Sequence, residues 1–291
     1  MLPPRVCRSM LSAAIALVLC LGASADEKPV SKVSGWQRLF REQAAGYRVV
    51  VEGGEQPEVK LLDEPILQWS QPVRGGADGT VFLWAQDGCP AAIGTFFIWP
   101  MGDGRQGITH ELHSLSQSPL TARWRDRKWT PPKDSVTWTT LADTTPAAGT
   151  PEQRLRQMRD LAREFHAQSR DKNDRVWELR LLPRPIYRYE LRRRADANES
   201  QRELIDGALF GFVEGTDLEV VLLLEAHRTT DGDQWQHAAA RMSDFSLKMT
   251  RGGKMIWEVG PAGYDDPRVA YYCSTVETRR SPDEEGPASA E

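Results

Sequence analysis

The sequence predicts an α+β fold in which one passage, a helix followed by an antiparallel and curved meander of strands, occurs twice. Three short motifs support this tandem repeat, because they return in the same order after 116, 120 and 128 residues. The pairs are Gln37-Arg38-Leu39 with Gln153-Arg154-Leu155, Leu61-Leu62 and Pro65-Ile66 with Leu181-Leu182 and Pro185-Ile186, and Asp78-Gly79 with Asp206-Gly207. A repeat of this kind constrains the architecture more than any single element does. The alternative is one continuous sheet in which the matches arise by chance.

Two stretches have the pattern of a helix start. Ser34 with Gln37, and Thr150 with Gln153, have capping-box spacing, and Pro151 suits the first helical position. Apolar residues then recur at helical spacing. They are Trp36, Leu39, Phe40 and Ala44 in the first stretch and Leu155, Met158, Ala162 and Phe165 in the second. We therefore expect two helices, each with one apolar face to bury against a sheet.

Strand patterns follow both helices. Apolar and polar residues alternate through 177–181, 187–192 and 245–249, which is typical of strands with one solvated face. Residues 93–99 and 220–224 are largely apolar without alternation and predict strands buried on both faces.

Two prolines and a glycine pair predict local bends. Pro65 and Pro185 fall at matching places inside the strand pattern, where proline indicates an edge, a bend or a bulge. Gly252-Gly253 lies between two apolar stretches and is typical of a hairpin turn.

These patterns divide the chain into six segments. They are a signal peptide (1–25), a linker (26–33), the first repeat (34–140), a second linker (141–149), the second repeat (150–262) and a C-terminal extension (263–291) with a disordered tail from about 281.

The N-terminal segment predicts export. Arg5 and Arg8 precede an apolar stretch from Leu11 to Leu21, and Ala23-Ser24-Ala25 forms a small-residue cleavage site. We expect a periplasmic or extracellular protein without a stable transmembrane anchor after cleavage, since the apolar stretch is short for a bilayer span. Cleavage would remove two arginines and no acidic residue, so the net charge would move from −4 to −6. This acidic balance argues against nucleic acid as a partner.

Two cysteines, Cys89 and Cys273, remain after the signal peptide. In an exported chain a pair of cysteines suggests one disulfide, although two separate thiols are the equal alternative. No further ligands stand at zinc-site spacing, so we expect neither a metal nor a cofactor.

The segment Thr109-His110-Glu111-Leu112-His113 is the strongest catalytic candidate, because His110, Glu111 and His113 are acid–base or metal-ligating types. The two histidines are three residues apart, which differs from the spacing of the zinc metalloprotease helix. On a strand, Glu111 and His113 would share one face and His110 the other. The alternative interpretation is that they are polar positions on the solvated face of the sheet.

Aromatic residues are the candidates for ligand binding. The chain has ten tryptophans, and flat aromatic faces can bind apolar ligands, although core packing is the commoner role. The candidates are Trp84, Trp124, Trp129, Phe210 and Phe212. Trp124 and Trp129 flank the charged segment 125–128, so we expect them to be exposed near a turn. Any ligand cavity should be lined from the strands that begin at Val81 and Leu209.

Four segments carry a resemblance to a group of sequences. Leu181–Tyr189, Asp206–Phe212, Thr109–Ser116 and Trp129–Pro132 resemble uncharacterised exported proteins of planctomycete-type bacteria. The resemblance covers most of the mature chain and implies export, but it implies no activity. By analogy of fold alone, a helix wrapped by a curved sheet is similar to cystatin-like and nuclear-transport-factor-like domains and to lipoprotein-carrier half-barrels.

Three functions follow as hypotheses. The first is an exported, non-catalytic module that binds an apolar small ligand or a protein partner in the cell envelope. The second is a hydrolase or metal-dependent enzyme that uses His110, Glu111 and His113. The third is a structural envelope component. The absence of a nucleophile elbow or a phosphate-binding glycine loop favours the first.

Overall fold

A computed structural model describes residues 34–52, 58–71, 77–191, 203–230 and 232–281. The residues from Ser34 onward form one compact unit. The predicted signal peptide, the linker at 26–33 and the tail after residue 281 lie outside the described residues.

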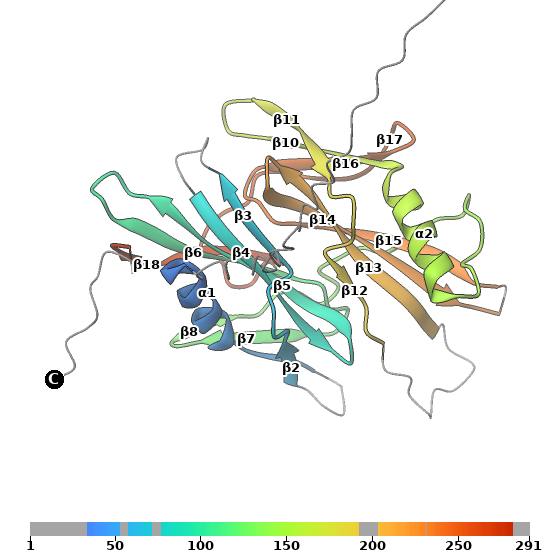
Figure 1. The fold of residues 1–291 in the computed structure, drawn as a ribbon, viewed down its shortest axis with the longest axis horizontal. Coiled ribbons are helices and arrows are strands. Elements are labelled where there is room, and N and C mark those ends of the chain that lie inside the picture. Colours follow the sequence, from blue (N-terminus) through green and yellow to red (C-terminus); the bar gives the residue numbers. More distant parts are fainter. Residues whose placement is uncertain (1–33, 53–57, 72–76, 192–202, 231, 282–291) are drawn as a thin grey trace, which may run out of the picture. The chain divides into compact units, whose positions relative to one another are not determined.

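The described part of the chain is mostly β, with two helices and eighteen strands in two antiparallel sheets (Figure 1). The first half contains α1 (Gly35–Ala45), β1 (Arg48–Val51), β2 (Glu58–Leu61), β3 (Leu67–Gln71), β4 (Ala77–Gln86), β5 (Cys89–Pro100), β6 (Gln106–Ser114), β7 (Leu120–Trp124), β8 (Arg127–Trp129) and β9 (Thr139–Thr140). The second contains α2 (Pro151–Ala162), β10 (Phe165–Arg170), β11 (Val176–Leu181), β12 (Tyr187–Arg188), β13 (Glu203–Glu214), β14 (Asp217–Arg228), β15 (Gln234–Arg241), β16 (Ser246–Arg251), β17 (Lys254–Val259) and β18 (Tyr271–Arg279).

The two sheets share one strand order. The first has the order β18-β6-β5-β4-β2-β1-β7-β8, with β3 on β4, and the second has the order β9-β15-β14-β13-β11-β10-β16-β17, with β12 on β13. Neither is the simple meander that the sequence predicts, because β7 and β16 return beside the first strand of their own half. This return curls each sheet around its helix.

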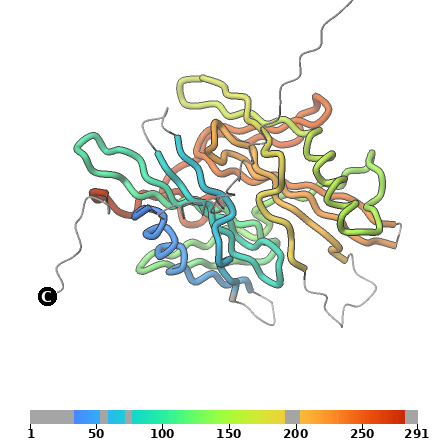
Figure 2. Tube along the Cα trace, viewed as in Figure 1, coloured from blue at the N-terminus to red at the C-terminus, as the bar shows by residue number. Residues whose placement is uncertain are grey.

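The last strand of each half crosses to the other sheet. β9 follows the first-half strands but pairs with β15, and β18 follows the second-half strands but pairs with β6. Figure 2 shows β18, in red, beside the green strand β6. The predicted C-terminal extension at 263–291 therefore supplies an edge strand of the first sheet.

Both helices begin where the sequence predicts. The Ser34 side chain and Gln37 form a complete capping box, and the Thr150 hydroxyl accepts a hydrogen bond from the Gln153 amide. Gly252 and Gly253 both have positive φ in the turn between β16 and β17. Glycine suits this turn because it adopts positive φ without steric cost.

The recurring sequence motifs make equivalent hydrogen bonds. The Leu62 and Ile66 amides donate to carbonyls of Leu83 and Val81, across the bend that contains Pro65. In the second half the Leu182 and Ile186 amides donate to carbonyls of Gly211 and Leu209, across the bend that contains Pro185. The repeated proline bend is thus present in both halves.

The recurring Asp-Gly motif also has a physical reason in both halves. A Cβ at Gly79 would lie 2.4 Å from the Trp69 ring, and one at Gly207 would lie 2.5 Å from the Tyr189 ring. Only glycine leaves room for the aromatic side chain that the bent strand lays over β4 or β13.

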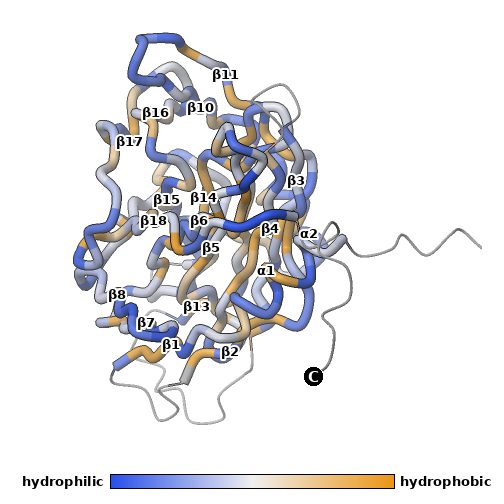
Figure 3. Tube along the Cα trace, turned by 90° about the vertical axis from the view of Figure 1, so that its left-hand side faces the viewer, coloured by the Kyte–Doolittle hydropathy of each residue, from blue (hydrophilic) through white to orange (hydrophobic). Residues whose placement is uncertain are grey.

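Three apolar cores arrange the elements in four layers. One core joins α1 to the first sheet through residues such as Phe82 and Phe96, and another joins α2 to the second sheet through residues such as Phe210. The third lies between the sheets, where Val81 and Leu223 are both buried. In Figure 3, hydrophobic segments run through the central strands, and the turn between β10 and β11 is hydrophilic.

Asp206 is the centre of a buried ion-pair network. Its Oδ2 atom lies 2.8 Å from Nε of Arg154 in α2 and 2.8 Å from Nη2 of Arg188 in β12. Arg154 also donates to the carbonyls of Ala148 and Gly149, so the network fixes the chain that enters α2.

We predict that Asp206→Asn lowers the free energy of unfolding by about 3 kcal/mol, because buried Arg154 and partly exposed Arg188 lose their counter-charge. Asp78 is the matching residue of the first half and is exposed. Asp78→Asn should therefore change the free energy of unfolding by less than about 0.5 kcal/mol. Urea denaturation of both variants measures the difference, and equal effects would contradict the role of the network.

Candidate functional site

The structure separates the three residues of the predicted catalytic cluster, all of which lie in β6. His110 points into the core beneath α1, where its Nδ1 lies 2.8 Å from the Tyr47 hydroxyl and its Nε2 lies 2.8 Å from Oε1 of Gln43. Burial lowers the pKa of His110 to about 3, so the ring is neutral near pH 7. His110 is a satisfied core residue and has no access to a substrate.

Glu111 and His113 lie on the opposite face of β6, between the two sheets. The Tyr271 hydroxyl in β18 donates to Glu111 Oε1 at 2.5 Å, and the Cys273 sulfur lies 3.9 Å from the same oxygen. Burial raises the pKa of Glu111 to about 8, although the hydrogen bond from Tyr271 lowers it. Burial lowers the pKa of His113 to about 4, and its Nδ1 lies 2.8 Å from the Ser114 carbonyl.

Arg241 belongs to this inter-sheet cluster. Its guanidinium lies over the Tyr271 ring, 5.1 Å from the centroid, and donates to the carbonyls of Ser243, Phe245 and Gly260. These bonds tie the connection between β15 and β16, and the residue that follows β17, to the end of β15. The cluster joins β6, β15 and β18, and its hydrogen bonds have a structural role.

This arrangement does not form the single site that the enzyme hypothesis requires. His110 and His113 lie on opposite faces of one strand, so they cannot act on one substrate. Within the residues that the structure describes, no group of three or more His, Cys, Asp or Glu side chains could hold a metal ion.

The structure contains a second inter-sheet polar cluster, which the sequence did not predict. Glu225 in β14 accepts a hydrogen bond from the Tyr189 hydroxyl at 3.0 Å, and its other oxygen lies 2.8 Å from Nε2 of His227. Only the i, i+2 spacing of Glu225 and His227 on a strand could have indicated that they share a face. Their partner Tyr189 comes from a distant bend and could not be predicted.

Of the two alternatives for Cys89 and Cys273, a disulfide or separate thiols, the structure has the separate thiols. Cys89 begins β5 near Glu225, where burial raises its thiol pKa to about 12. Cys273 lies in the middle of β18 beside Glu111, and burial raises its thiol pKa as well. Neither thiol has the lowered pKa that a reactive cysteine needs.

The aromatic candidates are core residues. Trp84, Phe210 and Phe212 are at most 1% exposed. Trp124 and Trp129 are also buried, which corrects the prediction of an exposed pair near a turn. Trp124 stacks on Tyr47 with ring centroids 5.8 Å apart, and Trp129 donates to the Val269 carbonyl at 2.9 Å. The three tryptophans belong to the core beneath α1, and the two phenylalanines belong to the core beneath α2.

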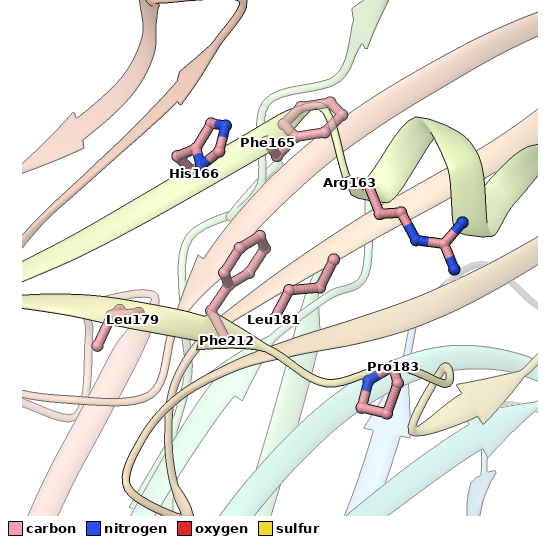
Figure 4. Close-up of a pocket in the computed structure, with 7 residues that line it drawn as sticks. All are labelled: Arg163, Phe165, His166, Leu179, Leu181, Pro183 and Phe212. Carbon is pink, nitrogen blue, oxygen red and sulfur yellow. The ribbon is translucent and has the colours of Figure 1, made fainter.

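A pocket of about 330 Å³ opens at the end of α2. Its floor is apolar, and its exposed edge is formed by two polar residues and one proline. The lining residues are Phe165, Leu179, Leu181 and Phe212 in the floor and Arg163, His166 and Pro183 at the edge. Figure 4 shows Phe212 and Leu181 extending toward Phe165, with Arg163 and Pro183 on one side. Phe212 is the one predicted ligand residue that lines this pocket.

The pocket exists because β11 changes partner beside it. Leu179 is the last residue of β11 in register with β10, and Arg180 and Leu181 pair with β13 instead. β10 and β13 therefore diverge, and Phe165 and Phe212 face the gap between them. The backbone topology, not any sequence motif, creates this opening.

We call the place where β11 changes its pairing partner a fork. The equivalent fork of the first half is spanned by polar contacts. β2 changes partner in the same way, from β1 at Val59 to β4 at Lys60. Here Arg41 in α1 donates to the Asp63 carbonyl at 3.1 Å and to Glu64 Oε2 at 2.9 Å. These bonds tie α1 to the proline bend.

The second half cannot form this bridge. Pro183 and Arg184 stand where the first half has Asp63 and Glu64. Gln157 stands where Arg41 does, and it bonds instead to the Pro146 carbonyl and the Ala148 amide.

A second pocket, of about 360 Å³, lies along β10, β11, β16 and β17. Charged and polar residues, including Arg170, Lys248 and Glu258, form most of its lining. It is less suited to an apolar ligand than the pocket at α2.

Comparison with protein-family models, curated proteins and solved structures gives no match for this chain. Neither helix of the described residues has the length and apolar character needed to span a membrane.

We predict that stability falls as the pH rises through the range in which Glu111 titrates. The folded-state pKa of about 8 exceeds the ordinary value of 4.5, so the folded protein holds a proton that the unfolded chain releases. His110 and His113 have lowered pKa values and cost stability only below their ordinary value of 6.5. Above pH 6.5 the loss therefore comes from Glu111 among these three.

The test is the unfolding free energy of the wild type and Glu111→Gln between pH 6.5 and 8.5. The wild type should lose about 1–2 kcal/mol relative to the variant over this interval, because the initial slope of about 1.4 kcal/mol per pH unit levels off near the folded pKa of about 8. Glu277→Gln, at the outer end of β18, is the control and should keep the wild-type slope. An unchanged slope in Glu111→Gln would show that Glu111 does not carry the effect.

Proposed function

We propose that this protein is an exported, non-catalytic binding module that takes an apolar small ligand in the pocket at the end of α2. The apolar floor of this pocket carries the proposal, because Phe165, Leu181 and Phe212 line an opening at a place where the matching half has hydrogen bonds from α1 to the proline bend. The volume falls within the usual range for ligand pockets, about 300–1,000 Å³. The pattern of the first 25 residues, with basic, apolar and small residues in succession, supports export.

The geometry also favours binding over catalysis. The buried acid–base groups at Glu111 and Glu225 have internal hydrogen-bond partners between the sheets. The pocket at α2 has one basic and one imidazole side chain at its edge, Arg163 and His166, and no carboxylate, thiol or hydroxyl in its lining. The site therefore offers shape and apolar surface to a ligand, without a nucleophile.

We further propose that the halves are tandem copies of one unit, with the boundaries 34–140 and 150–262 that the sequence suggests. The shared strand order, the matched bonds across the Pro65 and Pro185 bends, and the paired glycines support this proposal. One copy has its fork bridged and the other has it open, so binding would be confined to the second copy.

Filling the pocket should abolish binding. Leu181 is half-buried in the lining, and Leu181→Trp would place an indole in the opening. Leu61→Trp is the matched control, because Leu61 occupies the same position in the first half. We expect 1-octanol to shift the backbone amide resonances of the pocket residues in the wild type and Leu61→Trp, and to leave them unshifted in Leu181→Trp.

The dissociation constant from the same NMR titration should rise by at least about tenfold in Leu181→Trp, which corresponds to about 1.4 kcal/mol. Thermal unfolding of both variants checks that the fold is intact. Octanol binding that is equal in Leu181→Trp and Leu61→Trp would place the ligand elsewhere and refute the proposal.

A further inference from the structure

The edge of the pocket at α2 is basic, whereas the equivalent edge in the first half is acidic. Arg163 and His166 line the opening, and exposed Arg184 follows Pro183 in the chain. At the equivalent bend of the first half, Asp63 and Glu64 stand in place of Pro183 and Arg184. The sign of the charge at the bend is thus reversed between the two halves.

The acidic groups near the opening already have basic partners. Glu164 Oε2 lies 2.7 Å from Nη2 of Arg251, and Arg251 lies over the Phe165 ring, 5.9 Å from its centroid. Asp160 pairs with Arg163 at 2.5 Å, but both side chains are more than 60% exposed. An exposed ion pair of this kind contributes little to stability, so a ligand can recruit Arg163 at little cost.

We infer that the ligand is an amphipathic anion, with an apolar chain on the floor of Phe165, Leu181 and Phe212 and an acidic head at Arg163. This inference rests on the proposed function of the pocket and specifies the class of its ligand. The carboxylate of a medium-chain fatty acid has the required chemistry, because a guanidinium binds a carboxylate through two parallel hydrogen bonds. His166, on the same edge, offers a ring nitrogen as a further partner.

The test compares three probes with the same eight-carbon chain: octanoate, 1-octanol and octylamine. Amide chemical-shift titrations at pH 7 and low salt give the dissociation constant of each probe for the mature protein. We expect octanoate to bind about tenfold more tightly than octanol, and octylamine to bind more weakly than octanol. In Arg163→Gln, octanoate should lose this advantage and octanol should bind as it does to the wild type.

A matched control is Arg156→Gln, because Arg156 is an exposed arginine of the same helix and lies outside the pocket lining. It should leave the preference for octanoate unchanged. If octanol and octanoate bind equally, or if Arg163→Gln keeps the preference, the inference about the acidic head is wrong while the apolar pocket stands. If no probe shifts the pocket resonances, the proposed function fails together with the inference.

Discussion

Four central strands, β4, β5, β13 and β14, are buried on both faces, and the rest of the structure follows from this constraint. One face of each pair is covered by the sheet's own helix and aromatic core, and the other face only by the opposite sheet. Polar side chains on the inner faces therefore need partners in the protein, because water does not reach them. Glu111 meets this need with Tyr271, and Glu225 with Tyr189 and His227.

Apolar contact between two sheets is not directional, so directional bonds have to set how the sheets lie on each other. Tyr187 in β12 donates to the Gly88 carbonyl at 2.9 Å, and the Thr216 hydroxyl donates to the Ser70 carbonyl at 2.7 Å. The exchanged strands β9 and β18 add backbone hydrogen bonds between the halves. Because each half completes the other sheet, the two halves fold as one unit rather than as two separate domains.

Local elements could be predicted from the sequence because their causes are local. The caps at Ser34 and Thr150, the doubly buried strands and the turn at Gly252-Gly253 depend on residues a few positions apart. The exchange of β18 could not be predicted, since its pairing with β6 joins Cys273 to Glu111 across 162 residues. The alternation of side chains along β6 correctly predicted that His110 and His113 lie on opposite faces. The partners on the inner face, Tyr271 and Arg241, come from other strands and could not be predicted.

The site shows why a repeated motif can mislead about function. The motifs that recur, such as Leu181-Leu182 and Pro185-Ile186, make the hydrogen bonds that both halves need for the same bend. What differs between the halves lies inside the motif, where Pro183-Arg184 replaces Asp63-Glu64. In the first half these residues accept hydrogen bonds from Arg41 in α1. In the second half the fork stays open over an apolar floor. Function is therefore best sought where matched positions of the two halves differ, because the fold already explains the positions that agree.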